Sequence, residues 1–197
     1  MTIGILALQG DFAEHKKRLE ELGASSVELR QQSDITALDG LVLPGGESTV
    51  QRKLLQELDM LDPLKKAIQQ GLPVLGTCAG LILLAEEVNG GEPAFGTLPV
   101  RVQRNAYGRQ LGSFAVRQPF KGLGEIEMRF IRGPYIEAAQ DDVEILAVTE
   151  GKITAVRYQN QLGMAFHPEL SSDVCIHQEF LRMVERESFG SSITRAF

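Results

Sequence analysis

The chain has 197 residues, of which 43% are hydrophobic and 23% charged, and these values are typical of a folded domain. Its formal net charge is -6 and it has no long basic run, so nucleic acid is not an expected partner. No apolar stretch is long enough to cross a bilayer and the first residues lack the pattern of a secretion signal, which predicts a cytoplasmic protein without a membrane partner. We expect one domain over residues 1–187 and a flexible tail over residues 188–197.

The first half of the chain alternates short apolar runs with amphipathic segments. The apolar runs predict buried strands at residues 2–8, 27–30, 40–44 and 73–76. Helical spacing of apolar residues predicts helices at residues 12–22, from 48 onward, at 63–70 and at 81–88. Because parallel strands need crossovers whose helices land on the sheet, this order predicts a three-layer α/β fold, with a mostly parallel sheet and helices on both faces.

The second half is rich in short strand-like segments and has few helical patterns. These segments lie at residues 100–103, 110–117, 126–131, 143–149, 153–158 and 162–166. Strands that follow one another without helices between them pair most simply as hairpins, so we expect additional antiparallel strands here. A last amphipathic helix is predicted from residue 173 to about residue 187.

The sequence Gly-Thr-Cys-Ala-Gly at 76–80 places Cys78 between a buried strand and an apolar helix. Glycines two residues to either side let the strand and the helix approach closely, as in the turn that carries the nucleophilic serine of α/β hydrolases. At the start of a helix the positive end of the dipole favours a thiolate, so Cys78 is a candidate nucleophile. The same residues also fit a small apolar cysteine at a tight turn, and a nearby base is needed to decide.

A candidate base follows the last predicted strand, where His167 precedes Pro168 and Glu169. Proline favours extended backbone, in which side chains two residues apart point to the same side. Glu169 can therefore hydrogen-bond His167 and stabilise its imidazolium, as the third member of a catalytic triad does. Alone, His-Pro-Glu is typical of a solvated turn. In an open α/β sheet, this segment and the cysteine turn both lie at carboxyl ends of strands, where active sites form.

A third candidate element is Leu-Pro-Gly-Gly-Glu-Ser-Thr at 43–49, which runs from a strand into a helix. It lacks the lysine and the spacing of a phosphate-binding loop. Its adjacent glycines leave a peptide free of side-chain bulk, so the N–H groups of Gly46 and Ala79 can form an oxyanion hole beside Cys78. An ordinary turn capped by Ser48 is the alternative interpretation.

Six motifs, spread over most of the chain, carry a family resemblance. They are Leu-Gln-Gly at 8–10, Leu-Pro-Gly-Gly-Glu-Ser-Thr at 43–49, Gly-Thr-Cys-Ala-Gly at 76–80, Arg-Asn-Ala-Tyr-Gly-Arg-Gln at 104–110, Phe-Ile-Arg-Gly-Pro at 130–134 and Phe-His-Pro-Glu-Leu at 166–170. The cysteine turn and His-Pro-Glu indicate the class I (triad) glutamine amidotransferases. The Gly-Gly-Glu-Ser-Thr, Arg-Asn-x-x-Gly-Arg-Gln and Phe-Ile-Arg motifs resemble, within that class, the glutaminase subunit of pyridoxal 5′-phosphate synthase.

The resemblance implies that Cys78 is the nucleophile and that His167 and Glu169 are its relay partners. It further implies that glutamine is held by Gly46, Glu47, Ser48, Arg104, Ile131 and Arg132. Where alanine is expected after Phe-Ile-Arg this chain has Gly133, which loosens the backbone beside Arg132.

Free glutamine carries an α-carboxylate and an α-ammonium, so its site needs a cation and either an anion or carbonyl acceptors close to the nucleophile. Arg104 or Arg132 and Glu47 have the required charges. The sequence leaves open which of these contacts are direct.

The remaining candidate ligands do not form a metal-binding pattern. His15 is expected at the surface or in a subunit contact. Cys175 and His177 lie two residues apart on the last predicted helix and so do not face one another. We therefore expect no metal and no cofactor.

The expected reaction is hydrolysis of L-glutamine to L-glutamate and ammonia by a single glutaminase domain. The resemblance implies that ammonia passes to a separate synthase subunit, which uses it with a pentose phosphate and a triose phosphate to form pyridoxal 5′-phosphate. Gln9, at the end of the first strand, is the candidate for sensing the docked subunit. Two alternatives remain open: a glutaminase that serves another ammonia acceptor, and a redox-sensing or chaperone-like protein that uses the Cys78 thiol without hydrolysis.

Overall fold

The structure is a computed structural model that describes residues 1–104, 113–131 and 133–194. Its helices are α1 (Phe12–Glu21), α2 (Ser48–Glu57), α3 (Leu61–Gln69), α4 (Ala79–Leu84) and α5 (Cys175–Thr194), with short 3-10 helices η1 (Gln32–Asp34) and η2 (Pro168–Leu170). Its strands are β1 (Thr2–Leu6), β2 (Ser25–Leu29), β3 (Gly40–Leu43), β4 (Val74–Thr77), β5 (Ala85–Asn89), β6 (Leu98–Gln103), β7 (Phe114–Phe120), β8 (Gly124–Phe130), β9 (Tyr135–Ala139), β10 (Glu144–Thr149), β11 (Lys152–Tyr158) and β12 (Gln161–Met164). Across the described ranges, no helix combines the length and apolar character needed to pass through a bilayer.

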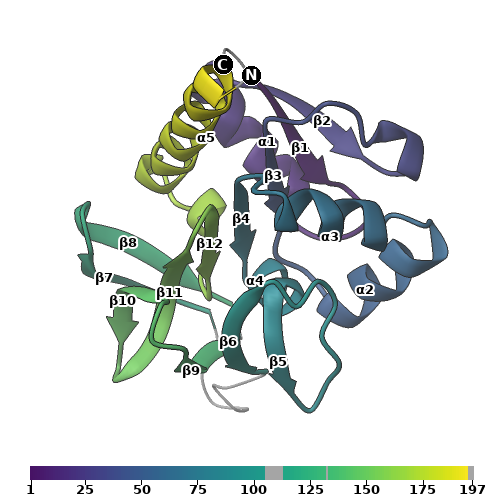
Figure 1. The fold of residues 1–197 in the computed structure, drawn as a ribbon. Helices are drawn as coiled ribbons and strands as arrows, with labels where there is room; N and C mark the ends of the chain where they lie inside the picture. Colours follow the sequence, from purple (N-terminus) through teal and green to yellow (C-terminus); the bar gives the residue numbers. More distant parts are fainter. Residues whose placement is uncertain (105–112, 132, 195–197) are drawn as a thin grey trace.

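Ten strands of the described residues form one sheet in the order β2-β1-β3-β4-β12-β11-β9-β6-β5, with β10 paired to β11 beside this path (Figure 1). The pairs from β2 to β12 are parallel. Antiparallel pairs begin where β11 joins β12 and continue through β9 to β6. Strands β7 and β8 form a separate antiparallel sheet. The expected mostly parallel sheet, with additional antiparallel strands in the second half of the chain, is therefore confirmed.

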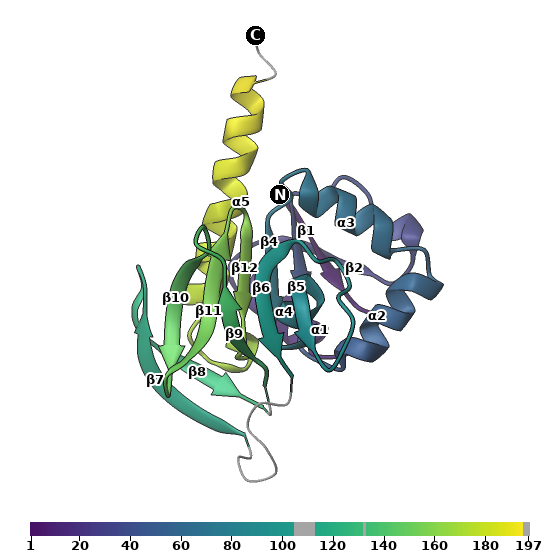
Figure 2. The ribbon, with the colours of Figure 1, turned by 60° about the horizontal axis from the view of Figure 1, so that its bottom comes forward.

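Helices cover both faces of the parallel half (Figures 1 and 2). The chain passes from β1 through α1 to β2, and from β3 through α2 and α3 to β4, which are steps in opposite directions along the sheet. Crossovers between parallel strands are right-handed, so these two connections lie on opposite faces. Helix α5 lies on the α1 face, where Phe180 and Val184 pack against Gly40. The expected three layers are confirmed.

The parallel strands β3, β4 and β12 are buried along their whole length. A strand covered on both faces has no solvent side, which is why these segments read as continuous apolar runs rather than as alternating patterns. They belong to one apolar core that extends from Ile3 to Val184. Packing on both faces fixes the strands, so the segments that leave their carboxyl ends start from defined positions.

The helix predicted at residues 81–88 is wrong in its second part. Helix α4 begins at Ala79 and ends at Leu84, and the chain continues directly as strand β5, which pairs with β6. Ladder hydrogen bonds to β6 satisfy the backbone there, and this pairing outweighs the local helical preference of Glu86 and Glu87. Strand β9 was not predicted either; it follows Gly133 and Pro134 and pairs with β6 and β11.

The last helix extends further than predicted. Helix α5 runs from Cys175 to Thr194, so the segment from 188 to 194, expected as a tail, is helical. No proline interrupts this stretch, and the helix leaves the body of the molecule at its C-terminal end (Figure 2). The strand predicted at 110–117 begins at Phe114 within the described residues, and positions 110–112 lie outside them.

Candidate active site

Four adjacent strands, β1, β3, β4 and β12, end at the same edge of the sheet. The segments that follow them carry Gln9, the Gly45-Gly46 pair, Cys78 and His167. This is the edge at which open α/β sheets bind ligands. The four segments meet around a cleft of about 390 Å³.

Cys78 has a strained backbone, with φ 48° and ψ -100°. Residues other than glycine rarely adopt a positive φ, because the side chain then clashes with the backbone. Such strain is typical of a nucleophile held in a strand-to-helix turn. A Cβ atom at Gly80 would collide with the Leu43 carbonyl oxygen, and one at Gly76 would lie 2.7 Å from a methyl group of Leu84. The predicted steric need for small residues at both positions is confirmed.

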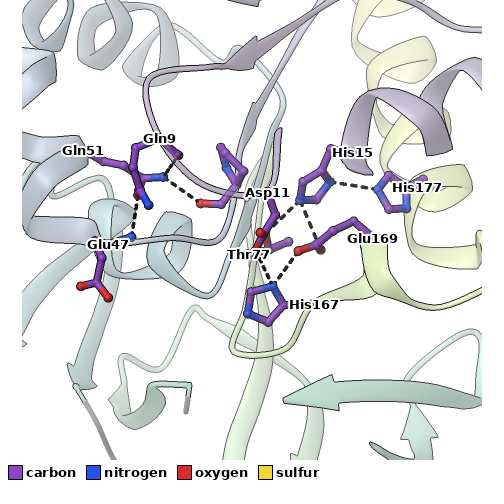
Figure 3. A network of polar contacts seen from close by, with 10 residues as sticks. Gln9, Asp11, His15, Glu47, Gln51, Thr77, His167, Glu169 and His177 are labelled. Carbon is purple, nitrogen blue, oxygen red and sulfur yellow. Dashed lines mark hydrogen bonds and ion pairs between the residues drawn. The ribbon is translucent and has the colours of Figure 1, made fainter. Parts of the chain in front are cut away.

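His167 lies between two carboxylates. Its Nδ1 atom is 2.6 Å from Glu169 Oε1 and 3.3 Å from Asp11 Oδ2 (Figure 3). Burial lowers the pKa of His167, but its contacts with the Asp11 carboxylate, the Cys78 thiol and the Glu169 carboxylate outweigh this effect and raise the pKa to about 12. His167 is therefore an imidazolium at neutral pH.

The other ring nitrogen of His167, Nε2, is not occupied by either carboxylate. Within the described residues Nε2 is buried and makes no well-aligned hydrogen bond, although contact with the Cys78 thiol contributes to the raised pKa of His167. Burial raises the pKa of Glu169, and its hydrogen bond with His167 opposes that rise. The hydrogen bond with His167 is also the first cause of the lowered pKa of Asp11.

The Gly45-Gly46 loop is held by the turn that follows β1. Asp11 N–H donates to the Gly45 carbonyl at 3.1 Å. Glu47 N–H donates to Gln9 Oε1 at 2.7 Å (Figure 3). The peptide between the two glycines is trans, so the Gly46 N–H points away from Asp11. Gly46 has a φ of +145°, a conformation open to glycine.

The cleft brings together most of the residues that the sequence indicated. Those that line it are Gln9, Gly46, Glu47, Ser48, Cys78, Arg104, Ile131 and His167. Ala79, the first residue of α4, has a backbone N–H without an intrahelical acceptor, and Glu169 lies behind His167. Arg132 lies outside the described residues.

The SNO glutamine amidotransferase family matches residues 5–186 of the chain. The chain belongs to this family. The pyridoxal 5′-phosphate synthase subunit PdxT of Desulfitobacterium hafniense (strain DSM 10664 / DCB-2) is 59% identical over 183 residues, which cover 92% of each protein. The subunit of the same name from Methanocorpusculum labreanum (strain ATCC 43576 / DSM 4855 / Z) is 52% identical, and the match covers 93% of this chain and 98% of that protein.

Solved structures have the same fold as this amidotransferase. One, described as the crystal structure of a glutamine amidotransferase, has a TM-score of 0.89 and 41% identity over 93% of this chain and 98% of its own. A putative GMP synthase protein from Thermoplasma acidophilum has a TM-score of 0.70 and 22% identity over 98% of both chains, a likeness of fold alone. The expected class I glutamine amidotransferase-like fold is confirmed.

Two features of this amidotransferase differ from expectation. His15 is fully buried behind Glu169 rather than at the surface. Gly133 does not simply loosen the backbone, because a Cβ atom there would lie 2.7 Å from the Ala165 carbonyl oxygen. Glycine at this position permits a close approach of two backbone segments.

Asp11 is a site residue that sequence reasoning missed. Its backbone N–H holds the glycine loop and its carboxylate contacts His167, so it touches both sides of the cleft. Its place directly after Leu-Gln-Gly at the end of β1 was the available signal. Ligand-type atoms of Asp11, His167 and Glu169 lie within 4.8 Å of one another, but the short contacts join an imidazolium to carboxylates, and the expectation of no metal stays a prediction.

Proposed function

We propose that this chain is the glutaminase subunit of a pyridoxal 5′-phosphate synthase. In this proposal it hydrolyses L-glutamine to L-glutamate and ammonia, and it delivers the ammonia to a separate synthase subunit. Family membership and the printed names of relatives at 52% and 59% identity support it. The observation that carries the chemistry is His167, an imidazolium hydrogen-bonded to Glu169 and in contact with the strained Cys78.

In the first half of the proposed reaction, the Cys78 thiolate attacks the side-chain amide carbon of glutamine. The negative charge that develops on the amide oxygen is stabilised by the N–H groups of Gly46 and Ala79. His167 then donates its Nε2 proton to the departing nitrogen as the C–N bond breaks, which gives ammonia and a thioester. Glu169 stabilises the imidazolium and holds the ring in the required orientation.

In the second half, His167 is neutral and takes a proton from a water molecule. The resulting hydroxide attacks the thioester carbon, and a second oxyanion forms in the same position. Collapse of this intermediate breaks the C–S bond and regenerates the Cys78 thiolate beside the His167 imidazolium. The new side-chain carboxyl group loses its proton to water, and L-glutamate leaves.

Glutamine specificity is proposed to rest on charges around the cleft. Arg104 donates from Nη2 to Thr49 Oγ1 at 3.1 Å, which holds its guanidinium at the cleft wall for the α-carboxylate. Glu47 and Ser48 line the same cleft and offer acceptors to the α-ammonium, while Ile131 provides apolar contact. Arg132 keeps the role that the family resemblance implies.

Gln9 is proposed to sense the docked synthase subunit. Its side-chain oxygen accepts the Glu47 N–H at 2.7 Å and its carbonyl accepts from Gln51 Nε2 at 2.8 Å, so it already contacts the loop that includes Gly46. A partner that moves Gln9 would change the support of the Gly46 peptide. We also propose a cytoplasmic location, because a catalytic thiol is preserved in a reducing compartment.

The test is to measure kcat for glutamine hydrolysis with and without the synthase subunit. We expect slow hydrolysis by the free chain and activation on the order of 10²–10³-fold by the synthase, which is the value of one oxyanion donor. Gln9→Ala should lose most of this activation. Gln56→Ala, at an exposed position on α2, is the matched control and should be activated as the wild type is.

Each alternative has its own result. Cys78→Ala, which removes the sulfur, should abolish hydrolysis, and retained hydrolysis in that variant would remove the mechanism. Hydrolysis without activation by the synthase subunit would favour another ammonia acceptor. No hydrolysis by the wild type with or without the subunit would favour a redox-sensing or chaperone-like protein.

A further inference from the structure

Two buried histidines lie directly behind the proposed triad (Figure 3). His15 on α1 and His177 on α5 are both fully buried, and His15 Nδ1 lies 3.0 Å from His177 Nε2. The other nitrogen of His15, Nε2, lies 3.3 Å from Glu169 Oε2 and 3.1 Å from Thr77 Oγ1. Neither histidine takes part in the reaction described above.

Glu169 has only one oxygen satisfied by the triad itself. Oε1 contacts His167, whereas Oε2 is buried and receives no well-aligned hydrogen bond within the described residues. Burial and the negative charge of Asp11 both raise the pKa of Glu169. A buried carboxylate needs donors to stay ionised, and the His15 Nε2 atom is the nitrogen that faces Oε2.

The contacts assign the protons on both rings. A lone pair on His15 Nε2 would repel the Glu169 carboxylate at 3.3 Å, so we assign the proton to Nε2, where it is aligned with Thr77 Oγ1 and lies close to Glu169 Oε2. His15 Nδ1 is then an acceptor, and His177 Nε2 donates to it. His177 Nδ1 is left as a buried lone pair without a partner among the described residues, which costs less than a buried unpaired N–H.

We propose that His15 is a positioning residue, which is oriented by His177 and holds its Nε2–H 3.3 Å from Glu169 Oε2, so that its dipole stabilises the ionised Glu169 and leaves Oε1 to His167. The proposal rests on the glutaminase function proposed above. It makes the arrangement a chain of five side chains: Cys78, His167, Glu169, His15 and His177.

A neutral donor suits this position better than a cation. Burial lowers the pKa of His15 well below its usual value, and the neighbouring rings of His177 and His167 act in the same direction. The ring is therefore uncharged, and it can hold Glu169 without cancelling the carboxylate charge that stabilises the His167 imidazolium. An arginine or lysine in its place would compete with His167 for that charge.

The contact with Thr77 adds a second effect. Thr77 is the last residue of β4 and directly precedes Cys78. His15 therefore joins the strand that carries the nucleophile to the carboxylate that supports the base. The ionisable groups around the pair are Asp11, Arg18, Glu21, Cys78, His167 and Glu169.

The test compares two polar substitutions in the complex with the synthase subunit. His15→Gln places an amide N–H at the distance of Nε2 and can still reach Glu169, whereas the shorter side chain in His15→Asn reaches His177 only. We expect kcat to fall on the order of 10–100-fold in His15→Asn, as for other outer-shell orienting residues, with little change in the KM for glutamine. His15→Gln should recover most of this loss.

A pH profile separates positioning from general stability. Without its donor, Glu169 takes up a proton at higher pH, so the acid limb of kcat and of Cys78 alkylation by iodoacetamide should move up by about one pH unit in His15→Asn. Leu19→Ala, a fully buried position one turn further along α1, should lower Tm without moving the limb. If His15→Asn does not fold, His177→Leu removes the second donor and should give a smaller shift in the same direction.

An unchanged acid limb in the His15 or His177 variant would overturn the proposal, and so would an equal shift in Leu19→Ala. Alkylation is followed in a Cys175→Ser background and does not require glutamine hydrolysis. A wild-type complex that hydrolyses no glutamine would refute the proposed function, while the alkylation profiles would still decide the role of His15.

Discussion

The two sides of Cys78 are built in different ways. On one side, His167, Glu169, His15 and His177 are at most 2% exposed and are held by packing from α1, β12 and α5. On the other side, Gln9 and Gly46 are half-buried and Glu47 is exposed, and the loop depends on two hydrogen bonds to the turn after β1. The groups that move protons are fixed, whereas Gly46, one of the two proposed oxyanion donors, can be adjusted.

This difference separates two ways to control the proposed enzyme. A rigid base and carboxylate keep their geometry whether or not a partner is bound, because their positions follow from the core. A glycine peptide at the surface can change orientation at little steric cost. We therefore expect substitutions on the buried side to act equally on the free and the docked chain, and substitutions on the loop side to alter the response to the partner.

The largest loss of activity is expected from Glu169→Gln. The amide keeps the shape but removes the charge that stabilises the His167 imidazolium, and the matching change in a serine triad costs on the order of 10⁴-fold in kcat. The loss should be the same with and without the synthase subunit, measured as kcat for glutamine. Glu28→Gln, which changes a partly exposed carboxylate beside Lys16 and Arg30, is the control and should retain full activity. A loss of only a few-fold would reduce Glu169 to a turn residue.

A smaller effect is expected from Gly46→Ala. Alanine disfavours a φ of +145°, and its Cβ atom would collide with Gln9 Oε1, so the peptide must rotate. Loss of one oxyanion donor lowers kcat by about 10²–10³-fold, and here the loss should appear in the docked state, where the wild type has the donor. Gly23→Ala, with φ +76° and open space around it, has a comparable backbone cost and should leave kcat unchanged. Equal activation of Gly46→Ala and the wild type would remove the loop from the switch.

The parallel half could be predicted from the sequence because its strands are covered on both faces. Runs such as Gly40–Leu43 and Val74–Thr77 are buried throughout, so apolar content alone marks them, and their order fixes which loops meet at one edge. Strands β5 and β9 could not be predicted in this way. They are short and partly exposed, and they exist because β6 and β11 supply ladder partners distant in sequence.

The residues of the candidate site likewise differ in whether a local sequence pattern reveals them. Cys78, His167 and the glycine loop lie in motifs with recognisable local chemistry. The sequence therefore predicted that they meet, and in the structure they line one cleft. His15 had a usable signal, since it lies four residues before the fully buried Leu19 on α1 and therefore on the same helix face. Its partner His177 is 162 residues away, and no local pattern reveals a contact across that separation.

The uncharged histidine pair also has a consequence for stability in acid. The pKa of His177 is lowered to about 4, first by burial and then by the charge of Arg18. In the folded chain His177 therefore stays neutral at pH values at which the unfolded chain, with a pKa near 6.5, is already protonated. The contribution of a depressed histidine pKa to the free energy of unfolding is fully present above pH 6.5 and is lost as pH falls toward 4. For His177 this contribution amounts to about 3 kcal/mol. His15 acts with the same sign. Urea titrations should therefore give a lower midpoint at pH 5 than at pH 7, and His177→Gln should flatten that dependence; equal slopes in both proteins would show that α5 can charge this histidine without opening the core.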